Sequence, residues 1–174
     1  MSKIHPPPFS EKIKNLAKDD TIIMSACLLG INCVYNNSNN KCEQLFPLIQ
    51  KHHIIPICPE QLGGLPTPRV SQCIVSGSGE DVLMEKTKVV NRSNEDVTDN
   101  FLKGAAESLK IARLFDAKLA ILKEKSPSCG VHKIYNKPSS NKNHIVKGKG
   151  VTTAIFEKKG ILVYSEKDVI QEIL

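Results

Sequence analysis

The feature that most constrains the fold is a set of short apolar runs, each followed by a loop. They cover residues 21–26, 53–57, 119–122 and 161–164. Runs of this length suit buried strands better than helices. Helix-forming segments separate the runs, and strands that alternate with helices favour a parallel sheet. We therefore predict an α/β fold, a Rossmann-like single domain with a mainly parallel sheet flanked by helices.

The rest of the pattern predicts helices, turns and loops. Helices are expected over 10–17 with Ser10 as N-cap, over 96–116 with Thr98 as N-cap, and over 151–159, which Gly160 ends. A helix is also expected over 41–52, broken or started afresh at Pro47. Ser165 and Asp168 predict a capping box for a final short helix. Segments 82–84 and 87–90 are expected to pair as a hairpin, 61–69 to form an irregular loop, and 134–147 to form a polar, mobile loop.

Length and hydropathy limit the organisation of the chain. Its 174 residues are enough for one domain and short for two. We predict an N-terminal extension with a short helix over 1–20 and a single α/β domain over 21–174. No apolar run approaches the roughly 20 residues that a membrane helix needs, and residues 1–18 lack the apolar centre of a secretory signal. A cytoplasmic protein with reduced cysteines and no membrane partner is expected.

The net charge of +6 suits an anionic partner, either a nucleic acid or a charged metabolite. The lysines are scattered, however, and no basic run is longer than two residues. Five Phe, three Tyr and no Trp offer little surface for stacking on bases. The composition therefore supports RNA only weakly as a partner.

Three of the six cysteines share one position relative to the predicted strands. Cys27, Cys58 and Cys129 each lie in a loop that follows a short apolar run. In open parallel sheets, ligand sites form outside the carboxyl ends of the strands. The three loops can therefore meet at one point, although 31 and 71 residues separate the cysteines along the chain.

The spacing of these cysteines narrows what they could hold. Structural zinc commonly uses four ligands that include close CxxC pairs, and this chain has no CxxC. Three thiolates without a fourth suit a [4Fe–4S] cluster with one open iron, which would prefer a sulfur ligand to an oxygen ligand. The spacing alone leaves open both a metal centre and buried thiols that serve only as small apolar residues.

Several stretches resemble, in order and spacing, the thiouracil desulfidases, a small bacterial family long described as a domain of unknown function. They are MSACLLGINCVY, CPEQLGGLPTPR, GEDVL, DVTDNFLKGA, AILKEKSPSCG and GKGVTTAIF, within residues 21–166. The resemblance implies a Rossmann-like fold, a [4Fe–4S] cluster on three cysteines, and conversion of 2-thiouracil to uracil with release of sulfide.

Transferred to this sequence, the resemblance implies that Cys27, Cys58 and Cys129 bind the cluster. It also implies that Glu60 is the catalytic carboxylate and that the catalytic serine is Ser126 or Ser128. Glu60 would act as general base toward water, and the serine would position or relay a proton. One departure concerns the family's C-R-Y-D/N-G stretch, which reads Cys33-Val34-Tyr35-Asn36-Asn37 in this chain. The arginine of that stretch, and any substrate contact it makes, is absent.

Two alternatives remain at this point. The substrate is either a small thiolated base or a thiouridine within RNA, and the protein is either an enzyme or a module that stores or delivers sulfur. A thiol-redox protein is least expected, because a CxxC motif is lacking. Cys33 is not predicted to be a ligand, and Cys42 and Cys73 are predicted to be bystanders. The glycine-flanked turn at 148–150 precedes a helix and could bind an anion there.

Overall fold

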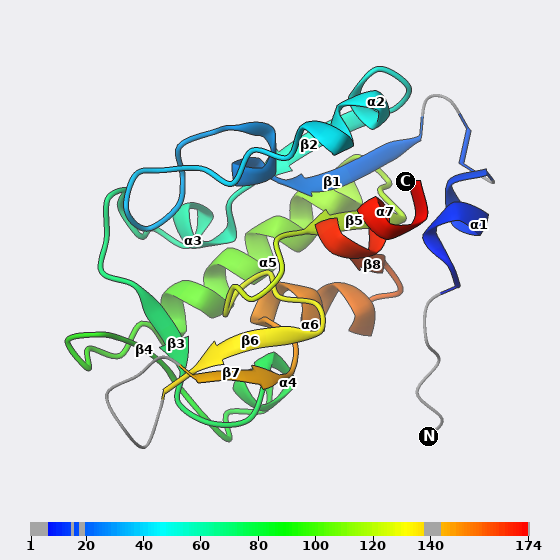
Figure 1. The fold of residues 1–174 in the computed structure, drawn as a ribbon. Coiled ribbons are helices and arrows are strands. Elements are labelled where there is room, and N and C mark those ends of the chain that lie inside the picture. The colour runs from blue at the N-terminus through cyan, green and yellow to red at the C-terminus, as the bar shows by residue number, and fades with distance from the viewer. Residues whose placement is uncertain (1–6, 15, 18–19, 138–143, 174) are drawn as a thin grey trace.

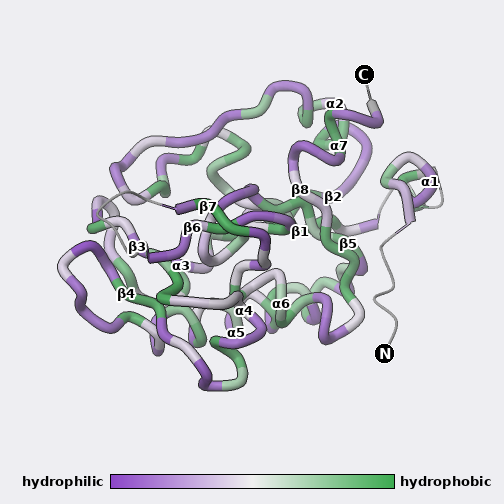
Figure 2. The backbone as a smooth tube through the Cα atoms, turned by 60° about the horizontal axis from the view of Figure 1, so that its bottom comes forward, coloured by the Kyte–Doolittle hydropathy of each residue, from purple (hydrophilic) through white to green (hydrophobic). Residues whose placement is uncertain are grey.

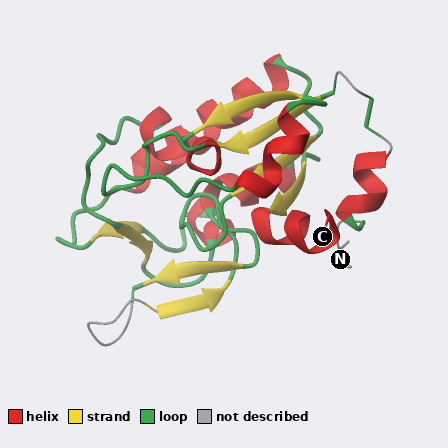
Figure 3. Ribbon diagram, turned by 45° about the horizontal axis from the view of Figure 1, so that its top comes forward, coloured by secondary structure: helices red, strands yellow, loops and turns green. Residues whose placement is uncertain are grey.

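The structure, a computed structural model, describes residues 7–14, 16–17, 20–137 and 144–173. Within these ranges the strands form two four-stranded sheets (Figure 3). The first is parallel throughout and has the order β2–β1–β5–β8. Its strands are β1 (Thr21–Ser25), β2 (His53–Ile57), β5 (Leu119–Leu122) and β8 (Leu162–Ser165). Each lies within one residue of a predicted run, and the predicted α/β class with a parallel sheet is confirmed.

Strands β1, β5 and β8 of the parallel sheet are buried on both faces, which is why they are almost continuously apolar. Successive side chains of a strand point to opposite faces. Ile22 and Met24 accordingly belong to one core cluster, whereas Ile23 packs in the other. Figure 2 shows these strands as hydrophobic segments inside a more hydrophilic periphery.

The second sheet is mixed and has the order β4–β3–β6–β7. Its strands are β3 (Gln72–Ile74), β4 (Val89–Asn91), β6 (Lys133–Asn136) and β7 (His144–Lys147). The strand β3 pairs antiparallel with β4 and parallel with β6. Figure 1 shows β6 and β7 beside α4, on the far side of α5 and α6 from the parallel sheet.

The predicted hairpin of 82–84 with 87–90 is wrong. Residues Gly79–Leu83 form helix α4, which begins with a capping box between Ser78 and Asp81. The Ser78 N–H donates to the Asp81 carboxylate over 2.8 Å. This local hydrogen bonding favours a helix start over a strand, and β4 pairs instead with the distant β3.

The prediction of a loop over 134–147 is also wrong. Strands β6 and β7 pair antiparallel, with Ile134 opposite Val146. Ile134 is fully buried while its neighbour Lys133 is exposed, because successive side chains of a strand point to opposite faces. The buried Ile134 side chain anchors a strand that is otherwise mainly polar. The predicted mobility concerns in part residues 138–143, which lie outside the described residues.

The principal helices are α5 (Thr98–Leu114) and α6 (Val151–Lys158), and α7 (Glu166–Ile173) ends the described chain. The capping box of Ser165 and Asp168 is confirmed, as is Gly160 after α6, with φ +82°. Thr98 does not cap α5, because it lies inside the helix. Asp96 instead accepts the Thr98 N–H over 3.0 Å.

Two shorter helical predictions were too long. Residues 41–52 contain a 3₁₀ turn over Glu43–Leu45 and the short helix α2 over Phe46–Ile49. Pro47 lies in the first turn of α2, where a proline is tolerated. The first helix, α1, covers Phe9–Lys14, so Ser10 lies within it and is not its N-cap.

The described part of the N-terminal segment packs on the C-terminal end of the chain (Figure 1). Phe9 is fully buried and stacks edge-to-face on Tyr164, with 5.2 Å between ring centroids. The Glu172 carboxylate accepts the Phe9 and Ser10 N–H groups. The division into a 1–20 extension and a 21–174 domain stays a prediction. No described helix has the length and apolar character needed to cross a bilayer.

Candidate active site

Cys27, Cys58 and Cys129 follow three adjacent strands of the parallel sheet, β1, β2 and β5. The chain moves outward from β1 to β2 and later returns to the other side of β1 with β5, so the strand order reverses between β1 and β5. Ligands bind at such reversal points. The three cysteines line one cavity of about 440 Å³, which is in the size range of small-molecule sites.

Close packing against α5 positions Cys58. It is the N-cap residue of helix α3 (Pro59–Leu62), which begins directly after β2. A Cβ on Gly63 would lie 2.0 Å from the Asn100 carbonyl oxygen, and one on Gly104 would lie 2.0 Å from the Pro59 carbonyl oxygen. Only glycines allow this approach of the two helices. The contact fixes Cys58 and Glu60 relative to the sheet.

Helix α6 holds the Ser-Pro-Ser-Cys loop. The N–H groups of Val151 and Thr152 donate to the carbonyl oxygens of Pro127 and Ser128, over 3.0 and 2.9 Å. The Thr153 hydroxyl donates to the Cys129 carbonyl oxygen over 2.9 Å. The first turn of α6 therefore binds this loop, so the anion site considered for the turn at 148–150 is not supported.

Glu124 binds the segment of the chain that follows Cys129. Its buried carboxylate accepts the N–H groups of His132 and Lys133, the latter over 2.6 Å. The backbone N–H of Glu124 in turn donates to the Glu166 carboxylate over 2.8 Å. The loop that carries Cys129 is thus fixed at both ends.

Cys33, which was not predicted to be a ligand, lies between two of the predicted ligands. Hydrogen bonding by Cys33 lowers the pKa of Cys27, and it lowers the pKa of Cys58 to about 7. The same hydrogen bonds raise the pKa of Cys33 above that of an ordinary thiol. Cys27 and Cys58 are therefore the members of this trio that give up a proton most readily.

Cys129 is also buried. Burial raises the pKa of its thiol, and the neighbouring Cys27 and Cys58 raise it further, while a hydrogen bond with Ser25 opposes this. A metal binds a thiol as the thiolate. Iron binding at this position would therefore release a proton from Cys129.

The donor set fits an iron–sulfur cluster. In the described part of the chain, no three His, Cys, Asp or Glu side chains are arranged to hold one metal ion. Cys27, Cys58 and Cys129 nevertheless line the same cavity and influence one another electrostatically. Cysteine thiolates are the ligands that hold iron–sulfur clusters, so three of them on one cavity fit such a group.

Glu60 faces the same cavity and is bound by Arg69. The Arg69 Nε and Nη2 atoms lie 2.8 and 2.6 Å from Glu60 Oε2. Both side chains are largely buried, at 13% exposure for Glu60 and 5% for Arg69. Among the described residues, Glu60 Oε1 has no hydrogen-bond donor, and it remains able to accept one.

The structure separates the two candidate serines. Ser126 lines the cavity, and its Oγ accepts the N–H groups of Ser128 and Cys129, both over 3.1 Å. Ser128 is 1% exposed and is not among the described residues that line the cavity; its hydroxyl pairs with that of Thr152 over 3.0 Å. Of these two candidate serines, only Ser126 is placed to contact a molecule in the cavity.

Sequence reasoning did not assign roles to several residues of the cavity wall. Arg69 is part of the CPEQLGGLPTPR motif, so its position was visible but its partners were not. Arg92 and Lys125 line the cavity and make no ion pair with any described residue. Cys73, predicted to be a bystander, lines the wall from β3, whereas Cys42 lies in the hydrophobic core.

Comparisons with known proteins show the family to which the chain belongs. The sequence profile of the family described as 2-thiouracil desulfurase matches residues 22–168. The chain is 43% identical over 148 residues to the uncharacterized protein YbbK of Bacillus subtilis (strain 168), covering 85% of this chain and 97% of that protein. It is 34% identical to a solved structure, the [4Fe–4S]-dependent thiouracil desulfidase TudS, with a TM-score of 0.73 and coverage of 88% and 95%. The chain belongs to the 2-thiouracil desulfurase family.

Proposed function

We propose that this protein hydrolyses the carbon–sulfur bond of a small thiolated pyrimidine such as 2-thiouracil, using a [4Fe–4S] cluster on Cys27, Cys58 and Cys129. The observation that carries the proposal is the convergence of these three thiols, Glu60 and Ser126 on one cavity. Membership of the desulfurase family and the likeness to TudS support the substrate class and the cofactor.

The cluster would supply an open iron, which is a Lewis acid and a soft acceptor for thiocarbonyl sulfur. The overall reaction is C=S plus water giving C=O plus hydrogen sulfide. Both protons of the water end on the departing sulfur, and no electrons are gained or lost. The protein therefore needs a base for the water and a route for protons to sulfur.

Glu60 is the base in this proposal. Arg69 occupies Oε2 and leaves Oε1 to accept a hydrogen bond from water in the cavity. A carboxylate held in this way can take a proton from water as the water attacks the thiocarbonyl carbon.

Ser126 donates a hydrogen bond in this proposal. Its Oγ already accepts two backbone N–H groups, and a hydroxyl oxygen has two lone pairs. Ser126 thus keeps its O–H as the group to offer a substrate. It orients the thiolated base or passes a proton, and does not act as a nucleophile.

Ser126→Ala is expected to lower kcat by about 10- to 100-fold, since one lost hydrogen bond to a polarised group is worth about 1.5–3 kcal/mol. Ser128→Ala is expected to leave kcat within about threefold, because Ser128 contacts Thr152 and not the cavity. It should instead lower the free energy of unfolding by about 1 kcal/mol. Steady-state sulfide release and urea unfolding measure the two effects, and equal losses of kcat would contradict the assignment.

Two alternatives, a thiouridine in RNA as the substrate and a non-catalytic sulfur-handling module, give different results in the same assays. For a thiouridine in RNA, affinity would fall steeply with salt, with a slope set by the number of phosphate contacts. We expect the KM for free 2-thiouracil, a molecule without phosphate, to change less than about twofold between 50 and 200 mM salt. A thiolated RNA that is desulfurated faster than the free base, with a steep salt slope, would favour the RNA substrate. Cluster-loaded protein that turns over neither would favour a sulfur-handling module.

A further inference from the structure

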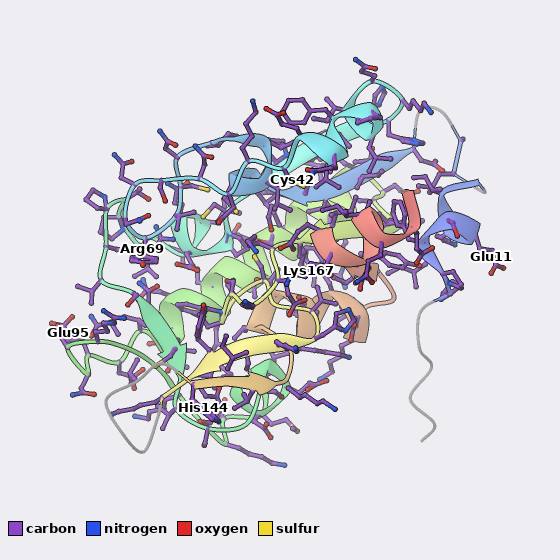
Figure 4. All side chains as sticks on the ribbon, viewed as in Figure 1. Glu11, Cys42, Arg69, Glu95, His144 and Lys167 are labelled. Atoms are coloured by element: carbon purple, nitrogen blue, oxygen red, sulfur yellow. The ribbon has the colours of Figure 1, made fainter. Side chains whose placement is uncertain are left out.

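Arg69 lies in the segment between α3 and β3 and is labelled in Figure 4. Its guanidinium has five N–H donors, and the structure gives an acceptor for each. Nε donates to Glu60 Oε2, and Nη1 donates to the Pro66 carbonyl oxygen and to Thr67 Oγ1, over 3.2 and 3.0 Å. Nη2 contacts Glu60 Oε2 and donates to the Cys33 carbonyl oxygen over 3.0 Å.

Because every donor has an acceptor, Arg69 cannot bind a substrate directly, which is the usual function of an arginine in a binding cavity. No N–H of Arg69 remains for a substrate oxygen, sulfur or anion. The side chain is also 5% exposed. Arg69 can therefore act on a reaction in the cavity only through the groups that it holds.

Those groups belong to three separate segments of the chain. Glu60 belongs to helix α3, Cys33 to the segment after β1, and Pro66 and Thr67 to the loop that leads to β3. The Arg69 backbone N–H also donates to the Tyr35 carbonyl oxygen over 2.7 Å. The Cys33 carbonyl oxygen accepts a long contact from Cys58 Sγ as well, at 3.7 Å. The Arg69 guanidinium thus connects the Glu60 carboxylate to the Cys33 segment, whose carbonyl oxygen also contacts Cys58.

We propose that Arg69 is the positioning residue of this site: it fixes the Glu60 carboxylate, through Oε2, relative to the Cys33 segment and the cysteines beside it. The inference rests on the proposed function, in which Glu60 acts on water. A planar fork is required because the acceptors lie on several sides of it. Lysine offers one compact charge with three donors and cannot bridge the same set.

The test compares Arg69→Lys, which keeps a positive charge beside Glu60, and Arg69→Ala, which leaves the largely buried Glu60 carboxylate unpaired, with the parent protein after anaerobic cluster loading, and the unfolding temperature of each variant is recorded. We expect kcat to fall about 100-fold in Arg69→Ala, the effect of a displacement of about 1 Å at a reacting group, with KM changed less than threefold. Arg69→Lys should retain the charge and lose most of the same rate. Millimolar guanidinium should restore part of kcat to Arg69→Ala and not to the parent protein. Arg113→Ala, on the exposed end of α5, is the matched control.

Different outcomes would overturn the inference. An Arg69→Ala protein with parental kcat would show that Glu60 needs no such support. A raised KM with unchanged kcat would make Arg69 a substrate-binding residue. If Arg69→Lys loses iron and its unfolding temperature also falls, Arg69 serves the folding of the loop that contains Pro66 and Thr67.

One measurement does not depend on activity. In a crystal structure of Arg69→Lys, we expect the Glu60 carboxylate to leave its parental position, in which it and the Cys33 carbonyl contact the same Nη2 atom of Arg69. An unchanged Glu60 side chain there would overturn the inference. If the parent protein itself releases no sulfide from a thiolated base, the proposed function fails, and this structural comparison still decides on Arg69.

Discussion

Cys129→Ala protein is expected to release no measurable sulfide from 2-thiouracil and to retain less iron than the parent protein. Cys129 is one of only three proposed protein ligands, so its loss leaves too few thiolates to hold the cluster. Polarisation by a Lewis-acidic metal is worth several kcal/mol, and each 1.4 kcal/mol is tenfold in rate. The expected loss is at least about 10³-fold in kcat/KM.

Anaerobic reconstitution followed by iron, sulfide and activity measurements tests this expectation. Cys42→Ala is the matched control, because Cys42 is also buried but lies in the hydrophobic core and outside the lining of the cavity. It should keep its iron and its activity and lose only some stability. Full desulfuration by Cys129→Ala would refute the cluster assignment.

Cys27→Ala and Cys58→Ala are expected to behave like Cys129→Ala, and Cys33→Ala is the informative fourth variant. If Cys33 were a ligand, its replacement would cost iron to the same extent. We expect Cys33→Ala to retain the cluster, because all three proposed ligands, Cys27, Cys58 and Cys129, are kept in this variant.

Glu60→Gln is expected to lower kcat by about 10²- to 10⁴-fold, the usual contribution of a general base. KM and iron content should change little, because glutamine keeps the shape of the side chain and an oxygen to accept from Arg69. Only the ability to take a proton is lost. Sulfide release under saturating 2-thiouracil, with the cluster absorbance recorded on the same samples, provides the measurement.

The choice of glutamine matters for this experiment. Glu60→Ala would leave the buried Arg69 charge without a partner, at a cost of about 3–5 kcal/mol, and would confuse instability with lost catalysis. Glu107→Gln, on α5 and outside the cavity lining, is the control for removal of one negative charge. A Glu60→Gln protein that keeps the parental kcat would remove Glu60 from the mechanism.

The sequence predicted the parallel sheet well because three of its four strands, β1, β5 and β8, are buried on both faces. Such strands are continuous apolar runs, and a run of this kind can be read without knowing its neighbours. The segments predicted incorrectly depend on distant partners or on a single cap. Strand β4 needs β3 as its partner, β6 needs β7, and α4 depends on the capping box at Ser78.

The sequence by itself determined the composition of the candidate site. Cys27, Cys58 and Cys129 each follow an apolar run, and Glu60 and Ser126 lie in motifs typical of the family. Strand order then brought these residues together at the reversal point between β1 and β5. Convergence could be anticipated because parallel strands direct their carboxyl ends to the same edge.

Only the tertiary structure decided how these side chains are used. It placed Ser126 in the cavity and Ser128 against Thr152, although both belong to one four-residue motif. It also placed Cys33 among the predicted ligands and gave every donor of Arg69 an acceptor. The physical reason is that hydrogen bonds and burial depend on residues far apart in the chain, whereas a motif records only which residues are neighbours along it.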